Sequence, residues 1–196
     1  MTVKRALVAI SLPIWIGSVT VGFLSLWHHS GVPGTAASPP ERWPAESRIP
    51  LTPGLDTLVL FAHPHCPCTR ASLSELALVL STTSVPVQAW VLIVKPEGVE
   101  AGWEKGGNYE LAQTISQARV MVDDRGSEAR RFGARTSGQV LYYDGGGRLR
   151  FHGGITAGRG HQGDSAGKES LLALISRKEP AEVETCVFGC SLLGPR

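Results

Sequence analysis

Cys66 and Cys68 stand one residue apart in the stretch FAHPHCPCTR, where a run of apolar residues gives way to an amphipathic pattern. The apolar run, residues 56–62, is typical of a buried strand, and the pattern from Thr69 to Ser81 is typical of a helix. A cysteine at such a junction faces the N-terminus of the helix, whose dipole and free N–H groups stabilise a thiolate. Because the thiolate is the reactive form of sulfur, the sequence predicts thiol chemistry or metal binding at this turn.

The bulk composition indicates one compact domain with an apolar appendage. The 196 residues are 42% hydrophobic and 18% charged, which is ordinary for a globular protein. A formal net charge of +2, without a basic patch interleaved with aromatic residues, argues against binding to nucleic acid. The four cysteines form two close pairs, Cys66/Cys68 and Cys186/Cys190, which are too few for a small disulfide-rich scaffold.

Residues 1–28 are predicted to form an uncleaved signal anchor, a single transmembrane helix. The run from Ala6 to Trp27 contains no charged side chain, and at about 1.5 Å per residue it would extend roughly 33 Å, enough to cross a bilayer core. Lys4 and Arg5 precede it, so the N-terminus is expected in the cytoplasm and the domain in the periplasm or another extracytoplasmic space. The alternative is a cleaved signal peptide, for which residues 35–37 offer small side chains. Either way, the cysteines lie where disulfides persist.

Three further segments complete the predicted organisation. Residues 29–53 are rich in proline and glycine and are expected to be an extended, semi-rigid spacer between the membrane and the domain. Residues 54–178 carry the alternating strand and helix patterns of the folded domain. Residues 179–196 form a C-terminal tail that contains Cys186 and Cys190.

The domain is expected to be of the α/β class, a mixed sheet with helices on both faces. Ser127 and Asp164 are predicted to cap two of the helices, and Gly133 is predicted to end one of them. The turn at residues 144–147 has the chemistry of a hairpin. Strands are predicted over 56–62, 85–94, 118–122, 139–143 and 148–152, and helices over 69–81, 109–117, 127–132 and 164–177.

This order, with paired cysteines where the first strand meets the first helix, resembles the thioredoxin fold from about Leu55 to Arg177. The chain is most similar to membrane-tethered extracytoplasmic proteins of the TlpA group. The motifs FAHPHCPCTRASLSEL, GGIT, RGHQGD and VFGC resemble those of a loosely defined set of RedB-type proteins. The resemblance implies a thiol–disulfide oxidoreductase with a redox-active centre at Cys66, which aligns with the nucleophilic cysteine. Thr69 falls where the resolving cysteine would be, and Cys68 lies inside the intervening dipeptide.

A second departure from the thioredoxin pattern lies before the strand expected at Gln139. Thioredoxins have a cis-proline there, beside the active cysteine, whereas this chain has Ser137-Gly138. Glycine permits unusual backbone angles without enforcing them. Ser137 and Gly138 are therefore candidate substrate-binding residues, with an ordinary loop as the alternative.

The oxidoreductase hypothesis assigns Cys66 as the nucleophile. The helix N-terminus would activate it, together with His63, His65 or Arg70. Thr69 is expected to cap the helix and to donate a hydrogen bond to the thiolate, and Arg70 to add positive potential.

The mixed disulfide that such a nucleophile forms must be resolved by a second thiol. Cys68 is the nearest candidate, in a small and strained ring, and Cys190 is another if the tail folds back over the site. Cys186 could resolve or could pair with Cys190. The expected partners are a protein thiol or disulfide substrate and an unidentified redox partner, with no cofactor.

The alternative hypothesis is a copper(I) site. His63, His65, Cys66 and Cys68 supply soft and borderline ligands within six residues, and His161 could add a distant one. This set resembles the Sco-type copper proteins, although their Cys-x-x-x-Cys spacing is absent from the turn.

Overall fold

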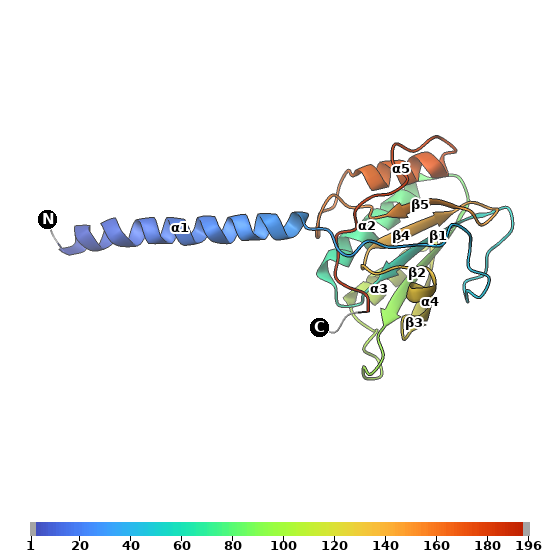
Figure 1. Ribbon diagram of the computed structural model, residues 1–196, viewed down its shortest axis with the longest axis horizontal. Helices are drawn as coiled ribbons and strands as arrows, with labels where there is room; N and C mark the ends of the chain where they lie inside the picture. The colour runs from blue at the N-terminus through green and yellow to red at the C-terminus, as the bar shows by residue number, and fades with distance from the viewer. Residues whose placement is uncertain (1–2, 194–196) are drawn as a thin grey trace. The chain divides into compact units, whose positions relative to one another are not determined.

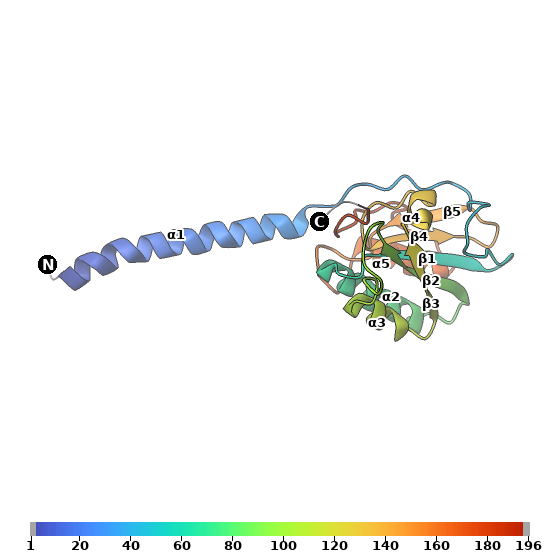
Figure 2. The ribbon, with the colours of Figure 1, turned by 90° about the horizontal axis from the view of Figure 1, so that it is seen from below.

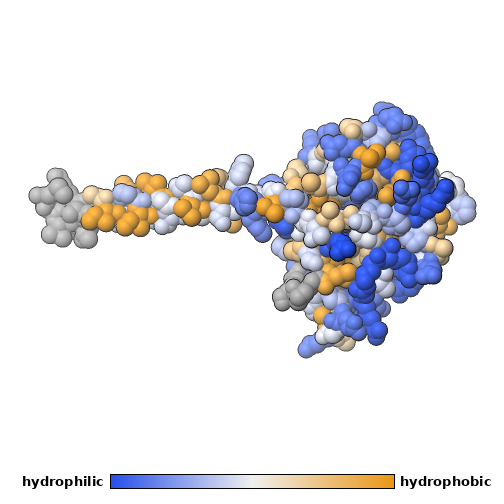
Figure 3. Space-filling model, in the orientation of Figure 1, coloured by the Kyte–Doolittle hydropathy of each residue, from blue (hydrophilic) through white to orange (hydrophobic). Residues whose placement is uncertain are grey.

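The chain carries an apolar N-terminal helix and a folded domain, which are described separately. A computed structural model describes residues 3–193 (Figure 1). The helix α1 (Val3–Gly31) contains a 23-residue segment, Ala9–Gly31, that is long and apolar enough to cross a membrane. Its described apolar side chains are exposed, among them Trp15 and Leu26. Figure 3 shows this apolar surface along α1, in contrast to the largely hydrophilic surface of the domain. The predicted N-terminal helix that could span a membrane is therefore present.

A five-stranded mixed sheet forms the centre of the domain, as predicted. Its strand order is β3-β2-β1-β4-β5. β1 pairs in parallel with β2, and β2 with β3, whereas β4 is antiparallel to both β1 and β5. The strands are β1 (Asp56–Ala62), β2 (Val87–Lys95), β3 (Ala118–Asp124), β4 (Gln139–Tyr143) and β5 (Leu149–Gly153).

Helices cover both faces of the sheet, also as predicted (Figure 2). The helices are α2 (Pro67–Thr82), α3 (Gly107–Gln113), α4 (Ser127–Arg131) and α5 (Ala166–Ile175). Leu73 of α2, Ala112 of α3 and Leu171 of α5 are buried in one core, against the sheet face that carries Leu60. Ala129 of α4 belongs to a second core on the opposite face. Because β1 is central, all its residues are buried, and its C-terminal end is held rigidly where the first cysteine follows.

The segment predicted as a spacer is instead part of the folded domain from Pro33 onward. Ile49 is 1% exposed in the second core. The indole of Trp43 packs edge-on against Phe132 and Tyr143, with ring centroids 5.0 and 5.1 Å apart. The prediction was wrong because prolines favour an extended chain whether it is solvated or lies flat on a sheet, and the apolar residues between them decide the outcome.

Helix α4 is capped from the preceding strand, not by Ser127 as predicted. The buried carboxylate of Asp123 accepts the backbone N–H groups of Glu128 and Ala129, both at 2.8 Å. Ser127 is the first helical residue, and its hydroxyl donates to the same carboxylate. Gly133 follows the helix with φ +64, which is the left-handed conformation that commonly ends helices. The predicted stop is therefore confirmed and the predicted cap is corrected.

Helix α5 begins after Ser165, whose hydroxyl accepts the Lys168 N–H at 3.2 Å. Asp164, the predicted cap, lies one residue too early and instead pairs with the Lys168 ammonium at 3.0 Å. That ammonium also lies 3.1 Å from the carboxylate of Glu75 on α2, and both of these side chains are buried. The Glu75 carboxylate further accepts the N–H of Gly163 at 2.7 Å. An ion pair thus joins the cysteine-bearing helix to α5.

Candidate active site

Cys66 lies between β1 and α2, at the N-cap position of the helix, with extended backbone angles. Pro67 then begins the helix, a position where a missing N–H costs nothing. The turn is tied to α3 because the side-chain amide of Asn108 donates to the carbonyls of Cys66 and His63, at 2.8 and 3.0 Å. The side chain of Cys66 is fully buried. Its sulfur is therefore fixed near the free N–H groups of α2.

Thr69 does not cap the helix, which corrects the predicted role. It is the third residue of α2, and no side chain caps this helix. The buried Thr69 hydroxyl is hydrogen-bonded to the Ser137 hydroxyl, which in turn accepts the His63 N–H at 2.7 Å. Thr69 and Ser137 therefore join the helix start to the loop before β4, directly beside Cys66.

The C-terminal tail places Cys190 against Cys66, with the two sulfurs 3.0 Å apart. The Ser137 N–H donates to the Cys190 carbonyl at 2.8 Å, and the Leu192 N–H donates to the Arg135 carbonyl at 2.9 Å. The tail around Cys190 thus pairs in antiparallel fashion with residues 135–137, as an isolated bridge at Ser191 also indicates. Leu192 is fully buried in the second core. Of the two predicted tail candidates, the structure brings Cys190 to the site.

Hydrogen bonds lower the pKa of the Cys66 thiol. Burial raises its pKa, but hydrogen bonds from the Cys190 thiol, the Thr69 hydroxyl and the backbone N–H groups of both residues outweigh burial, so the pKa lies below its ordinary value. The pKa of Cys68 is raised, first by burial and then by the negative charge of Cys66, against a hydrogen bond from Arg159. Between these two neighbours, the thiolate is therefore favoured at Cys66 and the thiol at Cys68.

The arginine of the site is Arg159, from the loop before α5. Its guanidinium donates to the Gly189 carbonyl at 2.7 Å and also bonds the Cys68 thiol. Arg70, which was predicted to supply the positive potential, is exposed on α2. His161 is also exposed, and its Nδ1 lies 3.0 Å from the Arg159 carbonyl. The sequence motif around residue 159 is thus part of the site through its arginine.

The two histidines before Cys66 shape the turn. Nδ1 of His63 accepts the His65 N–H at 3.1 Å, and Nε2 of His65 lies 2.8 Å from the Trp103 carbonyl. Both imidazoles meet the Trp103 indole edge-on, with ring centroids 5.0 and 4.7 Å apart. Within residues 3–193, no three His, Cys, Asp or Glu side chains form a group that could hold a metal ion. The residues of the copper hypothesis, His63, His65, Cys66, Cys68 and His161, are thus not gathered into a three-ligand group in the described part of the chain.

Gly138 occupies a backbone conformation that other residues rarely adopt, with φ +91. A Cβ atom there would lie 2.7 Å from the Ser72 hydroxyl of α2. The Gly138 N–H donates to the carbonyl of Phe61 at 2.8 Å, which holds this loop against the end of β1. Glycine at this position thus lets residues 135–137 present their N–H and carbonyl groups to the tail.

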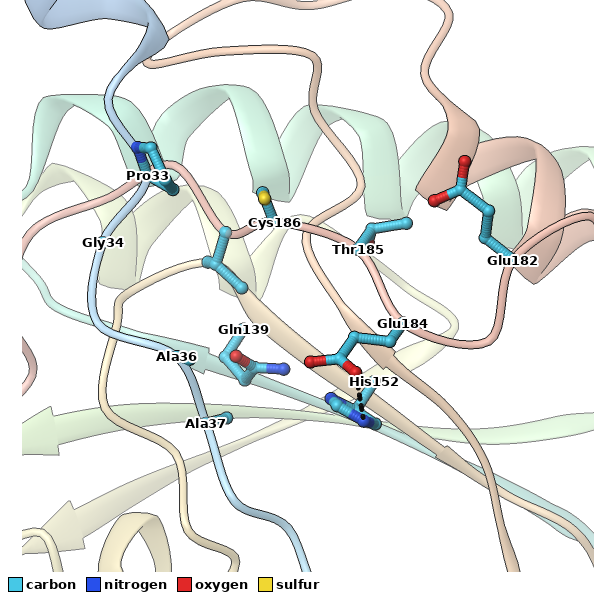
Figure 4. A pocket seen from close by; sticks show the side chains of 11 residues that line it. Pro33, Gly34, Ala36, Ala37, Gln139, His152, Glu182, Glu184, Thr185 and Cys186 are labelled. Atoms are coloured by element: carbon cyan, nitrogen blue, oxygen red, sulfur yellow. Dashed lines mark ion pairs between the residues drawn. The ribbon is translucent and has the colours of Figure 1, made fainter.

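A cavity of about 450 Å³ lies beside the first part of the C-terminal tail (Figure 4). Among the residues that line it are Pro33 and Gly34, Gln139 and His152, and Glu184 and Cys186 of the tail. Nε2 of His152 lies 3.9 Å from the Glu184 carboxylate, the ion pair that is dashed in Figure 4. Cys186 is exposed and carries a free thiol. Residues 181–186, the stem of the tail, therefore border open space, whereas Val187, Gly189 and Leu192 are buried.

Asn108, Arg159 and Gly189 contribute to the site but were not among the sequence-based candidates. The signal for Asn108 is weak: it is a polar residue directly before the helix predicted over 109–117. Arg159 lies in a glycine-rich loop, where a lone charged residue is notable, and Gly189 directly precedes a cysteine. None of these signals specifies contact with Cys66, because each contact depends on how distant segments fold together.

The acidity of Cys66 gives a testable pH dependence. Titration of the reduced protein should show a thiolate step in absorbance at 240 nm below roughly 8.5, the ordinary cysteine value, and Cys66→Ser should remove that step. Because the folded pKa is lower than the unfolded one, ionisation stabilises the folded state above the unfolded pKa. This stabilisation is lost as the pH falls through the folded value. A step at or above the ordinary value would contradict the assignment.

Comparison with known proteins gives similarity at the level of fold. No protein-family model and no curated protein matches the sequence. Among solved structures, an uncharacterized conserved protein from Geobacillus kaustophilus matches with a TM-score of 0.59 and 15% identity, over 84% of this chain and 93% of that one. A hypothetical protein from Sinorhizobium meliloti matches with a TM-score of 0.60 and 17% identity, over 82% and 93% of the two chains.

A third match is an exposed lipoprotein thioredoxin from Streptococcus pneumoniae. Its TM-score is 0.46 and its identity is 17%, over 63% of this chain and 85% of that one. The strand order, the strand directions and the helices on both faces agree with the fold expected from the sequence. The chain therefore has the strand order and helix arrangement of a thioredoxin-like fold.

Proposed function

We propose that this protein is a membrane-tethered, extracytoplasmic thiol–disulfide oxidoreductase whose redox pair is Cys66 and Cys190. The observation that carries the proposal is the 3.0 Å separation of their sulfurs at the N-terminus of α2. A disulfide bond is about 2.05 Å long, so an approach of about 1 Å joins them. The lowered pKa of Cys66 supports the same role, since the thiolate is the nucleophile and also the better leaving group.

The proposed reaction is an exchange between two pairs of cysteines. The oxidised protein takes two electrons from a substrate dithiol, which becomes a disulfide, and Cys66 and Cys190 become thiols. The reverse reaction reduces a substrate disulfide. The substrate class is a protein thiol or disulfide, a second redox partner restores the starting state, and the exchange needs no bound cofactor.

The helix α1 supports the proposed tether and compartment. Its apolar segment of 23 residues suits a membrane span, and a domain outside the cytoplasm would keep its disulfide. Of the expected resolving thiols Cys68 and Cys190, the proposal takes Cys190. Cys68 has a raised pKa and a hydrogen bond from Arg159, so it is the less reactive neighbour.

The test is a redox titration of the full chain in detergent. The full chain is needed because residues 33–50 pack on the domain. Metal-free glutathione buffers of graded potential, followed by alkylation and peptide mass mapping, should yield a reversible Cys66–Cys190 disulfide at roughly −120 to −270 mV. The variant Cys190→Ser should lose this disulfide, and the control Cys186→Ser should keep it. If Cys66 stays a free thiol in every buffer, the proposed function fails.

A further inference from the structure

We infer that external partners form their mixed disulfide with Cys190, on the tail. Cys66 is the buried cysteine that bonds to Cys190 within the protein. The inference rests on the proposed function, because it assigns the two ends of the same redox pair. It differs from the expectation that the cysteine at the helix N-terminus meets the substrate. The accessibility of the two sulfurs, the packing of the tail and the chemistry of exchange all support it.

Access is the first argument. Cys66 is 0% exposed, whereas Cys190 is half-buried. Exchange proceeds by attack along a line through the two bonded sulfur atoms, so an external sulfur must reach the atom that it attacks. With the tail in place, Cys190 is thus the residue of the pair that a partner can approach.

The packing of the tail is the second argument. A Cβ atom on Gly189 would lie 1.9 Å from the Ser137 carbonyl oxygen, so the chain before Cys190 runs directly against the loop beside Cys66. The guanidinium of Arg159 holds the Gly189 carbonyl, and Ser137 holds the carbonyl of Cys190. The tail thus covers Cys66 and leaves Cys190 half-buried.

The chemistry of exchange is the third argument. A partner thiolate attacks Sγ of Cys190 in the Cys66–Cys190 disulfide, the Cys66–Cys190 bond breaks, and Cys66 leaves as a thiolate. A second partner thiolate then attacks the partner's own sulfur in the mixed disulfide, and Cys190 leaves with the electron pair. The partner has become a disulfide and the protein a dithiol, so atoms and electrons balance. A leaving thiol of low pKa departs faster, which suits Cys66.

The stem of the tail permits the motion that this exchange needs. Glu182, Val183, Glu184 and Cys186 are exposed, and the stem borders the cavity in Figure 4. Few buried apolar contacts therefore hold residues 181–186, and the two backbone hydrogen bonds that Val183 and Thr185 make with His152 of β5 must open when the segment moves. Cys190, once bonded to a partner, can then move away from Cys66 with the rest of the tail.

Two single-thiol proteins test the inference. In the full chain with Cys68→Ser and Cys186→Ser, the added change Cys66→Ser leaves only Cys190, and Cys190→Ser leaves only Cys66. Both are mixed with oxidised glutathione at pH 8, and mass spectrometry follows the mixed disulfide. We expect Cys190 to react at least about 10-fold faster than Cys66, although the pKa of Cys66 is lowered. In concentrated urea the two rates should converge, which shows that the fold causes the difference.

Equal rates in the folded proteins, or a faster Cys66, would overturn the inference. Replacing oxidised glutathione by a disulfide-linked peptide distinguishes small from protein-borne partners, and Cys190 should lead in both arms. This comparison of the two reaction rates is independent of the redox titration. If the wild type forms no Cys66–Cys190 disulfide, the proposed function fails, whereas a normal disulfide with preferential reaction at Cys66 removes only the present inference.

Discussion

Replacement of Cys66 by serine is expected to abolish turnover in thiol–disulfide exchange. The rate of disulfide reduction by the full chain should fall at least about 1000-fold, because a serine hydroxyl neither ionises near neutral pH nor forms a bond to sulfur. Serine is nearly the same size, and the Thr69 hydroxyl is beside it, so the fold should persist. The measurement is steady-state reduction of a protein disulfide with glutathione as the electron donor, alongside thermal unfolding.

The exposed Cys186 provides the matched control. Cys186→Ser removes a thiol of the same tail and should keep the full rate. A Cys66→Ser protein that retained more than about a tenth of the wild-type rate would show that turnover proceeds without the buried thiol, since loss of an essential nucleophile costs far more than tenfold. A stoichiometric mixed disulfide on Cys190 in this variant is expected, because the first exchange does not need Cys66.

Replacement of Lys168 by methionine should produce the largest loss of stability. The change leaves the Glu75 carboxylate buried without its cation, and breaking a buried pair in this way costs about 3–5 kcal/mol. The free energy of unfolding, measured in urea, should fall by that amount. The acidic partners raise the pKa of Lys168 against the opposing effect of burial, so its charge stabilises the fold below the unfolded pKa and this contribution is lost as the pH rises through the folded value.

Two further variants separate the ion pair from general damage to α5. The Asp164 side chain is 91% exposed, so Asp164→Ala should cost less than about 1 kcal/mol. The double variant Lys168→Met/Glu75→Leu removes both charges and should recover much of the loss, because well-packed apolar residues can replace a buried ion pair. Loss of less than 1 kcal/mol in Lys168→Met alone would show that water reaches Glu75.

The strands were the most predictable part of this fold. The apolar run at 56–62 matches β1 residue for residue, since a central strand buried on both faces needs no alternation. Helix ends were less predictable. The helix expected over 109–117 ends at Gln113, and α5 is shorter than expected at both ends. Capping depends on distant or neighbouring polar groups such as Asp123, which the local pattern does not rank.

The candidate site was predicted in part. The reactive position of Cys66 follows from local sequence, because a strand, a turn and a helix N-terminus are adjacent along the chain. Its partnership with Cys190 joins residues 124 positions apart, so the sequence offered it only as one of several alternatives. The apolar residues between the prolines at 33–53 were misread for a similar reason, since their burial depends on a sheet face formed much later in the chain.

The attachment of Cys190 to the same chain as Cys66 has a consequence for isolating partners. Two groups joined by a short, flexible segment meet as if one were present at millimolar concentration. A partner left bonded to the tail is therefore exposed to rapid recapture of Cys190 by the Cys66 thiolate. Covalent complexes with the wild-type protein should be short-lived and escape affinity purification. Partners are then to be sought with the Cys66→Ser chain, in which a bond to Cys190 has no internal competitor of this kind.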